Sequence, residues 1–118
     1  LIYWMKQMTE HASIALQGRL VQDLVLPNIR LFGPLVYGVE VTIGVSLMLG
    51  LLTRLGAVFG LLMALNLWLG LYSAPGEWPW TYSFIVILQL LFAIDPPGRS
   101  LGADVLLCRR YRVSPLLV

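Results

Sequence analysis

The sequence predicts an all-α integral membrane protein. Three observations carry this fold class. The chain of 118 residues is 58% hydrophobic and only 12% charged, whereas a soluble domain is about half apolar and a quarter charged. Three long apolar stretches show no alternation of polar and apolar residues, which argues against strands. Proline and glycine clusters separate these stretches. We therefore expect a single-domain helical bundle, residues 1–118, that has lipid as its solvent.

Three full transmembrane helices are expected within this domain. The first two span residues 31–52 and 55–74. About 20 residues at about 1.5 Å each suffice to cross a hydrocarbon core of about 30 Å. The third helix, residues 80–95, is shorter and begins beside Trp78 and Trp80, aromatic residues typical of a membrane interface. "TRLG" is a tight turn between the first two helices, "PGEWPW" breaks the chain before the third, and "DPPGRS" ends it.

The N-terminal third differs from these spans. Residues 1–8, "LIYWMKQM", are typical of the end of a preceding membrane helix that meets the interface. Residues 9–30 place apolar side chains at helical spacing, with most polar ones elsewhere on the wheel. The apolar set is Leu16, Leu20, Val21 and Leu24. This pattern predicts an interfacial amphipathic helix, and the alternative is an ordinary re-entrant linker.

Basic residues predict the orientation of the bundle. Arg54 lies in the first turn, and four arginines lie in the tail of residues 99–118: Arg99, Arg109, Arg110 and Arg112. Because positive charge accumulates on the cytoplasmic side, we expect the C-terminus there. Arg109, Arg110 and Arg112 are interpreted as membrane anchors together with Trp78 and Trp80, since anionic lipid attracts basic residues.

Several classes of function are excluded by composition. A net charge of +2 without a basic tract argues against nucleic acid as a partner. A single cysteine, Cys108, excludes an intramolecular disulfide and any multi-cysteine metal site. His11 has no Cys or His partner close in sequence, so we expect it to be solvated. The sequence predicts no metal site and no covalently bound cofactor.

The candidate functional site consists of polar residues inside the apolar stretches. Helical rise places Glu40 about 12 Å, Asn66 about 10 Å and Gln89 about 13 Å from the same end of the bundle. Tyr37 lies one turn before Glu40, on the same face. We expect an inward-facing polar cluster, because a carboxylate in hydrocarbon costs about 2.5–3.5 kcal/mol. Its functional interpretation is a quinone-headgroup or proton-relay site. The structural alternative is interhelical hydrogen bonding that only holds the bundle together.

Four segments, "GLLTRLGA", the glutamate before it, "APGEWPW" and "GRSLGAD", resemble the DoxX/DoxD membrane family over residues 33–104. The family is typically a four-helix membrane bundle, and its DoxD type is the small subunit of thiosulfate:quinone oxidoreductase. The resemblance implies a multi-pass protein of a bacterial or archaeal inner (plasma) membrane. The closing Gly-Ala-Asp departs from the Ser-Leu-Asp order of the family, so we assign no function to Asp104.

Two functions remain open at this point. The resemblance implies a small subunit of a quinone-linked oxidoreductase, with quinone as its cofactor and Lys6, Arg19 and Arg30 as contacts for the thiosulfate anion. Since the sequence has no redox-cofactor motif, the electron carrier would lie in a partner subunit or be the quinone itself. The alternative is a non-catalytic accessory subunit packed against a larger respiratory or photosynthetic complex. Both predict the lipid bilayer and other membrane subunits as partners, and whether the chain is itself an enzyme stays open.

Overall fold

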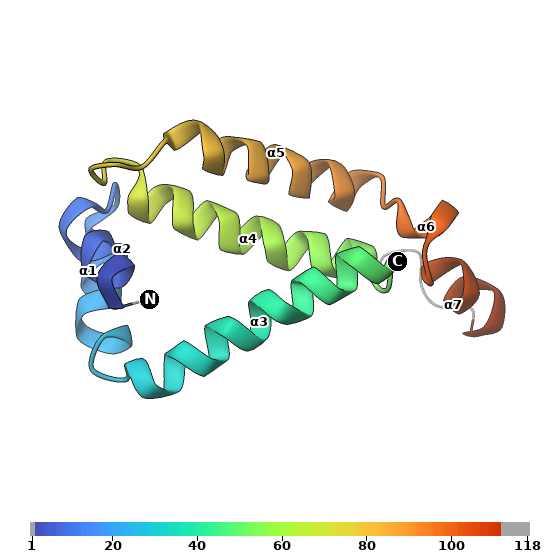
Figure 1. The fold of residues 1–118 in the computed structure, drawn as a ribbon, viewed down its shortest axis with the longest axis horizontal. Helices are drawn as coiled ribbons and strands as arrows, with labels where there is room; N and C mark the ends of the chain where they lie inside the picture. The colour runs from blue at the N-terminus through green and yellow to red at the C-terminus, as the bar shows by residue number, and fades with distance from the viewer. Residues whose placement is uncertain (1, 112–118) are drawn as a thin grey trace.

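The computed structural model describes residues 2–111, and every secondary-structure element in that range is helical. Three long helices form the body of the molecule: α3 (Ile29–Leu49), α4 (Thr53–Leu71) and α5 (Pro79–Ile94) (Figure 1). The all-α prediction is therefore confirmed. Each helix begins one or two residues before its predicted start and ends one to three residues before its predicted end.

Two of these helices are long and apolar enough to cross a membrane. They are α3, with 21 residues, and α4, with 19 residues. Helix α5 is also apolar but has 16 residues. It begins at Pro79, where the fixed φ angle of proline suits the first turn of a helix. Length and composition thus identify two candidate spans within residues 2–111, where the sequence predicted three full crossings.

The three helices pack unequally. Helices α4 and α5 run side by side, whereas α3 meets α4 near the turn and diverges from it toward its own N-terminus (Figure 1). None of the α3 residues is buried. The buried positions of α4 are mostly small residues, which allow two helices to approach closely: Gly56, Ala57, Gly60, Ala64 and Gly70.

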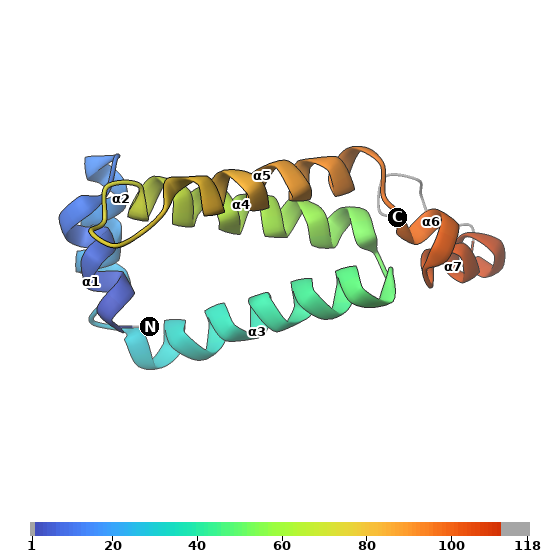
Figure 2. The same ribbon diagram turned by 45° about the horizontal axis from the view of Figure 1, so that its top comes forward.

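Three short helical segments gather at the end of the bundle where α3 begins and α4 ends. They are α1 (Ile2–His11), α2 (Ala15–Leu20) and the π-helical η1 (Val21–Val25) (Figures 1 and 2). The predicted end of a first membrane helix at residue 8 is instead part of α1, which continues to His11. Met8 of α1 is fully buried against Gly70 of α4, which anchors the segment on the bundle.

The predicted amphipathic face points differently from expectation. In α2 and η1, Gly18 and Val21 are buried, while Leu16, Leu20 and Leu24 are exposed. The bundle receives a polar side chain instead: Gln17 donates from Nε2 to the Asn66 backbone oxygen at 2.8 Å. Helical spacing identified an apolar stripe correctly, but it did not say which side of the stripe meets the protein.

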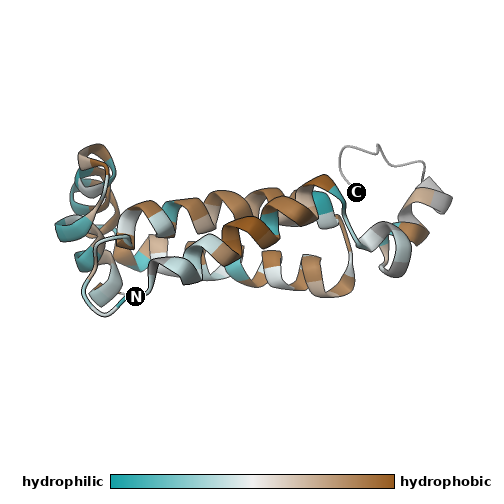
Figure 3. Cartoon of the chain, turned by 90° about the horizontal axis from the view of Figure 1, so that it is seen from above, coloured by the Kyte–Doolittle hydropathy of each residue, from teal (hydrophilic) through white to brown (hydrophobic). Residues whose placement is uncertain are grey.

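The opposite end of the bundle carries α6 (Gly98–Leu101) and α7 (Asp104–Tyr111), next to the α3–α4 turn. Arg54 and the C-terminal segment thus share one end, as predicted. The other end carries the predicted cations and tryptophans, all exposed: Lys6, Arg19, Arg30, Trp78 and Trp80. Hydrophobic residues predominate along the body between the two ends (Figure 3). The side chains of Arg99, Arg109 and Arg110, and all of Arg112, lie outside the described part.

Candidate functional site

A cavity of about 260 Å³ lies where α3, α4 and α5 meet, and we call it the polar pocket. Three of its lining residues carry oxygen atoms on long side chains: Glu40 from α3, and Tyr82 and Gln89 from α5. The remaining walls are apolar or glycine: Ile43, Gly44, Leu47, Gly60, Met63, Ala64, Leu67 and Ile85. Two of the four predicted site residues, Glu40 and Gln89, thus line one cavity.

Glu40 lies at the exposed edge of the polar pocket. It is an exposed residue of α3, and within residues 2–111 its carboxyl makes no hydrogen bond or ion pair. A carboxyl group that is held by no partner contributes little to packing. It is free to exchange a proton or to bind a ligand, which favours the functional interpretation of Glu40 over a purely structural one.

Gln89 forms the buried polar part of the pocket. Its Oε1 atom is inaccessible and receives no hydrogen bond from the described residues. The amide lies directly over Gly60 of α4, since a Cβ atom placed there would be 2.5 Å from Nε2 and 2.8 Å from Oε1. Leaving a buried acceptor without a donor costs about 1–3 kcal/mol. An unpaired acceptor beside a cavity is therefore a candidate ligand contact.

Tyr82 is a pocket residue that sequence analysis did not single out. Its hydroxyl donates to Glu77 Oε2 at 2.8 Å, so the phenol proton is already engaged and the oxygen remains an acceptor. Glu77 lies in the loop before α5, where sequence analysis indicated only a loop charge. The five-residue spacing of Glu77 and Tyr82 could have suggested contact across the first turn of α5.

Asn66 and Tyr37 lie apart from the polar pocket. The Asn66 side chain accepts a hydrogen bond from Gln17 Nε2 at 2.8 Å, and thereby ties α2 to α4. Tyr37 is 69% exposed. Matched depth brought Glu40 and Gln89 to the same cavity. Depth alone did not include the azimuth of Asn66 on α4, or the neighbouring segment that binds it.

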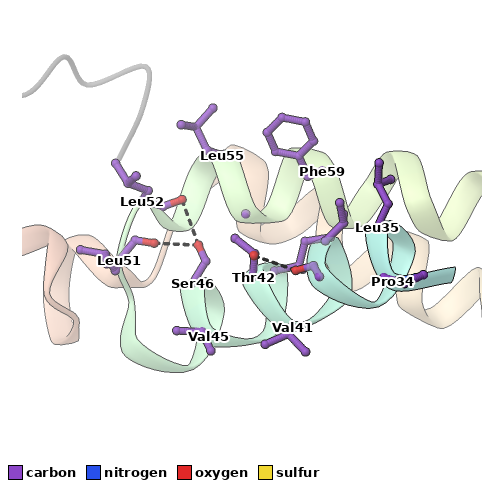
Figure 4. A pocket seen from close by; sticks show the side chains of 14 residues that line it. Pro34, Leu35, Val41, Thr42, Val45, Ser46, Leu51, Leu52, Leu55 and Phe59 are labelled. Atoms are coloured by element: carbon purple, nitrogen blue, oxygen red, sulfur yellow. Dashed lines mark hydrogen bonds between the residues drawn. The ribbon is translucent and has the colours of Figure 1, made fainter. Parts of the chain in front are cut away.

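A larger cavity of about 730 Å³ lies between α3 and α4, and we call it the apolar groove. Its walls run from Pro34 to Phe59 (Figure 4). The two hydroxyls in the view are used locally: Thr42 donates to the Gly38 oxygen at 2.7 Å, and Ser46 to the Leu51 oxygen at 2.7 Å. The groove therefore presents apolar contact without a free polar group for chemistry.

The most deeply buried carboxylate belongs to Asp104, to which we assigned no function. It is fully buried at the α3–α4 turn. Its oxygens accept from the Leu52 backbone nitrogen, from the Thr53 backbone nitrogen at 2.9 Å and from Thr53 Oγ1 at 2.7 Å. Asp104 thus caps the N-terminus of α4 from a distant segment, since Leu52 at the N-cap position has no capping side chain. We call this contact the aspartate cap.

Glycines make the aspartate cap sterically feasible. Gly50 has φ of 62°, and a Cβ atom there would be 2.6 Å from Gly102 Cα. A Cβ atom on Gly98 would overlap Thr53 Oγ1. The backbone nitrogen of Asp104 also donates to the Gly50 oxygen at 2.8 Å. The segments "GLLTRLGA" and "GRSLGAD" therefore lie in direct contact at this end.

Other candidate residues do not form a centre. No group of three His, Cys, Asp or Glu side chains suited to a metal ion occurs in the part of the chain that the structure describes. Cys108 is exposed. Lys6, Arg19 and Arg30 share one end of the bundle but belong to three different helices. Comparison of the chain with family models, curated proteins and solved structures found no match.

Proposed function

We propose that the chain is a small membrane subunit of a quinone-linked oxidoreductase and that the polar pocket is its quinone-reactive site. The observation that supports this most is the combination of Glu40 and Gln89 on one cavity with otherwise apolar walls. Small-molecule sites are typically apolar cavities with a few placed polar groups. The resemblance to the DoxX/DoxD family supplies the choice of quinone and of thiosulfate.

The chemistry assigns separate tasks to the two ends of the reaction. Reduction of a quinone takes up two electrons and two protons, and Glu40 has a carboxyl that can pass a proton. The electrons come from oxidation of thiosulfate outside the bilayer. Lys6, Arg19 and Arg30 provide positive charge at the end of the bundle away from the aspartate cap, where a dianion would be bound. A partner subunit, or the quinone itself, carries the electrons.

The test uses the full chain, extracted in mild detergent with whatever accompanies it. We expect thiosulfate-dependent reduction of a water-soluble quinone by the extract. Glu40→Gln preserves shape but cannot exchange a proton, so turnover should fall at least tenfold while the complex remains assembled. Asp23→Asn, at an exposed position of η1, is the matched control. Full activity of Glu40→Gln would remove Glu40 from the proposed site.

A second candidate is a non-catalytic accessory subunit, and α3 is the observation that favours it. A 21-residue apolar helix without a buried residue offers a long surface to lipid or to a larger membrane complex. The same extract separates the two functions. Copurifying subunits whose activity is unchanged when the polar pocket is altered by Gln89→Leu would support the accessory role.

A further inference from the structure

The polar groups of the polar pocket share one property: they offer hydrogen-bond acceptors. Gln89 Oε1 is buried and receives no donor from the described residues. The Tyr82 hydroxyl already donates its proton to Glu77, so its oxygen can only accept. Glu40, when ionised, is an acceptor as well. A ligand that satisfies this lining must therefore bring the proton.

The size and neutrality of the buried part narrow the ligand further. A cavity of about 150 Å³ is enough for benzene, so about 260 Å³ accommodates a substituted six-membered ring. Glu40 is exposed at the edge, whereas the buried acceptor is the neutral amide of Gln89. A neutral O–H donor matches a neutral buried acceptor. A cation at that depth would need the carboxylate beside it.

We propose that the polar pocket binds a lipid-soluble phenol or hydroquinone through a hydroxyl that donates to Gln89 Oε1, in preference to the oxidised quinone. Naming the hydroquinone rests on the proposed function, but the requirement for a hydroxyl does not. A quinone carbonyl would face the acceptors without a proton to share. In the enzyme this preference draws the reduced product into the pocket.

The test compares three probes on the purified full chain in detergent micelles: an alkyl-tailed hydroquinone, the matching quinone and an alkylphenol with the same tail. We expect the hydroquinone and the alkylphenol to bind at least tenfold more tightly than the quinone, which equals about 1.4 kcal/mol. Gln89→Leu should abolish that difference. Gln7→Leu is the matched control, because Gln7 Oε1 is also buried and unpaired but lies on α1, outside the pocket.

A second variant keeps the test decisive if Gln89→Leu fails to fold. Gly60→Ala places a methyl group against the Gln89 amide and must displace it, so the preference for hydroxyl probes should fall at least tenfold. Gly38→Ala has open space around its new methyl and should leave the preference unchanged. Equal affinity for quinone and hydroquinone would overturn the proposal. So would an alkylammonium ion that binds more tightly than the alkylphenol and depends on Glu40.

The outcomes also separate this inference from the proposed function. Hydroxyl-dependent binding by a chain whose complex never reduces quinone would refute the oxidoreductase role and leave the pocket assignment standing. Thiosulfate-dependent reduction of quinone without any effect of Gln89→Leu on probe binding would refute the pocket assignment alone.

Discussion

The aspartate cap and the polar pocket both contain acidic or amide side chains within an apolar protein, yet their hydrogen bonding is opposite. Asp104 is fully buried, and three donors from the start of α4 satisfy its oxygens. In the polar pocket, Gln89 Oε1 is buried without a donor and the Glu40 carboxyl has no partner among the described residues. A satisfied buried group stabilises the fold. An unsatisfied one beside a cavity can accept a hydrogen bond from a ligand.

This contrast reverses the expectation from sequence. Sequence analysis singles out Glu40 because a carboxylate is costly in hydrocarbon, and it assigns no function to Asp104 because the local motif departs from the family pattern. The structure gives Asp104 the larger structural role. Free energies of unfolding, measured for the full chain in detergent, provide a common scale for both regions.

The largest loss of stability is expected for Asp104→Ala. The change leaves the Leu52 and Thr53 backbone nitrogens and the Thr53 hydroxyl without their acceptor and removes the cap of α4. We expect the free energy of unfolding to fall by about 3 kcal/mol. Asp95→Ala, at an exposed carboxylate that follows α5, should change it by less than about 0.5 kcal/mol. Equal small effects of both changes would remove the distinction between the cap and an ordinary surface carboxylate.

Gly50→Ala should have the next largest effect, because it distorts the turn that the aspartate cap fastens. The residue has a positive φ angle, and a Cβ atom on it would lie 2.6 Å from the backbone of Gly102, so both strain and overlap oppose a methyl group. We expect a loss of about 2 kcal/mol in thermal or denaturant unfolding. Gly38→Ala, in the middle of α3 with open space, should be neutral or up to about 1 kcal/mol stabilising.

Gln17→Leu should have a moderate effect at the other end of the bundle. Gln17 Nε2 donates to both the backbone and side-chain oxygens of Asn66, so its removal loosens α2 from α4. We expect a loss of about 1 kcal/mol. Faster amide hydrogen exchange in α2, with α5 unchanged, is the specific readout. Gln22→Leu, on the exposed side of the same segment, is the control. Unchanged exchange in α2 would show that Met8, rather than Gln17, holds this end.

Glu40→Ala should have the smallest effect on stability. Since the carboxyl has no partner within residues 2–111, its removal should change the free energy of unfolding by less than about 0.5 kcal/mol. Interhelical hydrogen bonding would instead predict a loss of about 1–2 kcal/mol. A loss of that size would therefore place Glu40 with the structural group and weaken the contrast with Asp104.

Sequence alone determined the fold class, the approximate bounds of α3, α4 and α5, and the depths of Glu40 and Gln89. Apolar run length, helix-breaking prolines and helical rise are local quantities that need no knowledge of neighbouring segments. The tertiary structure decided the rest. Asn66 is bonded by Gln17, 49 positions away, and Asp104 caps a helix that begins 51 positions earlier. Such partners depend on how segments turn about their axes and on which glycines let backbones meet, and no local pattern records either.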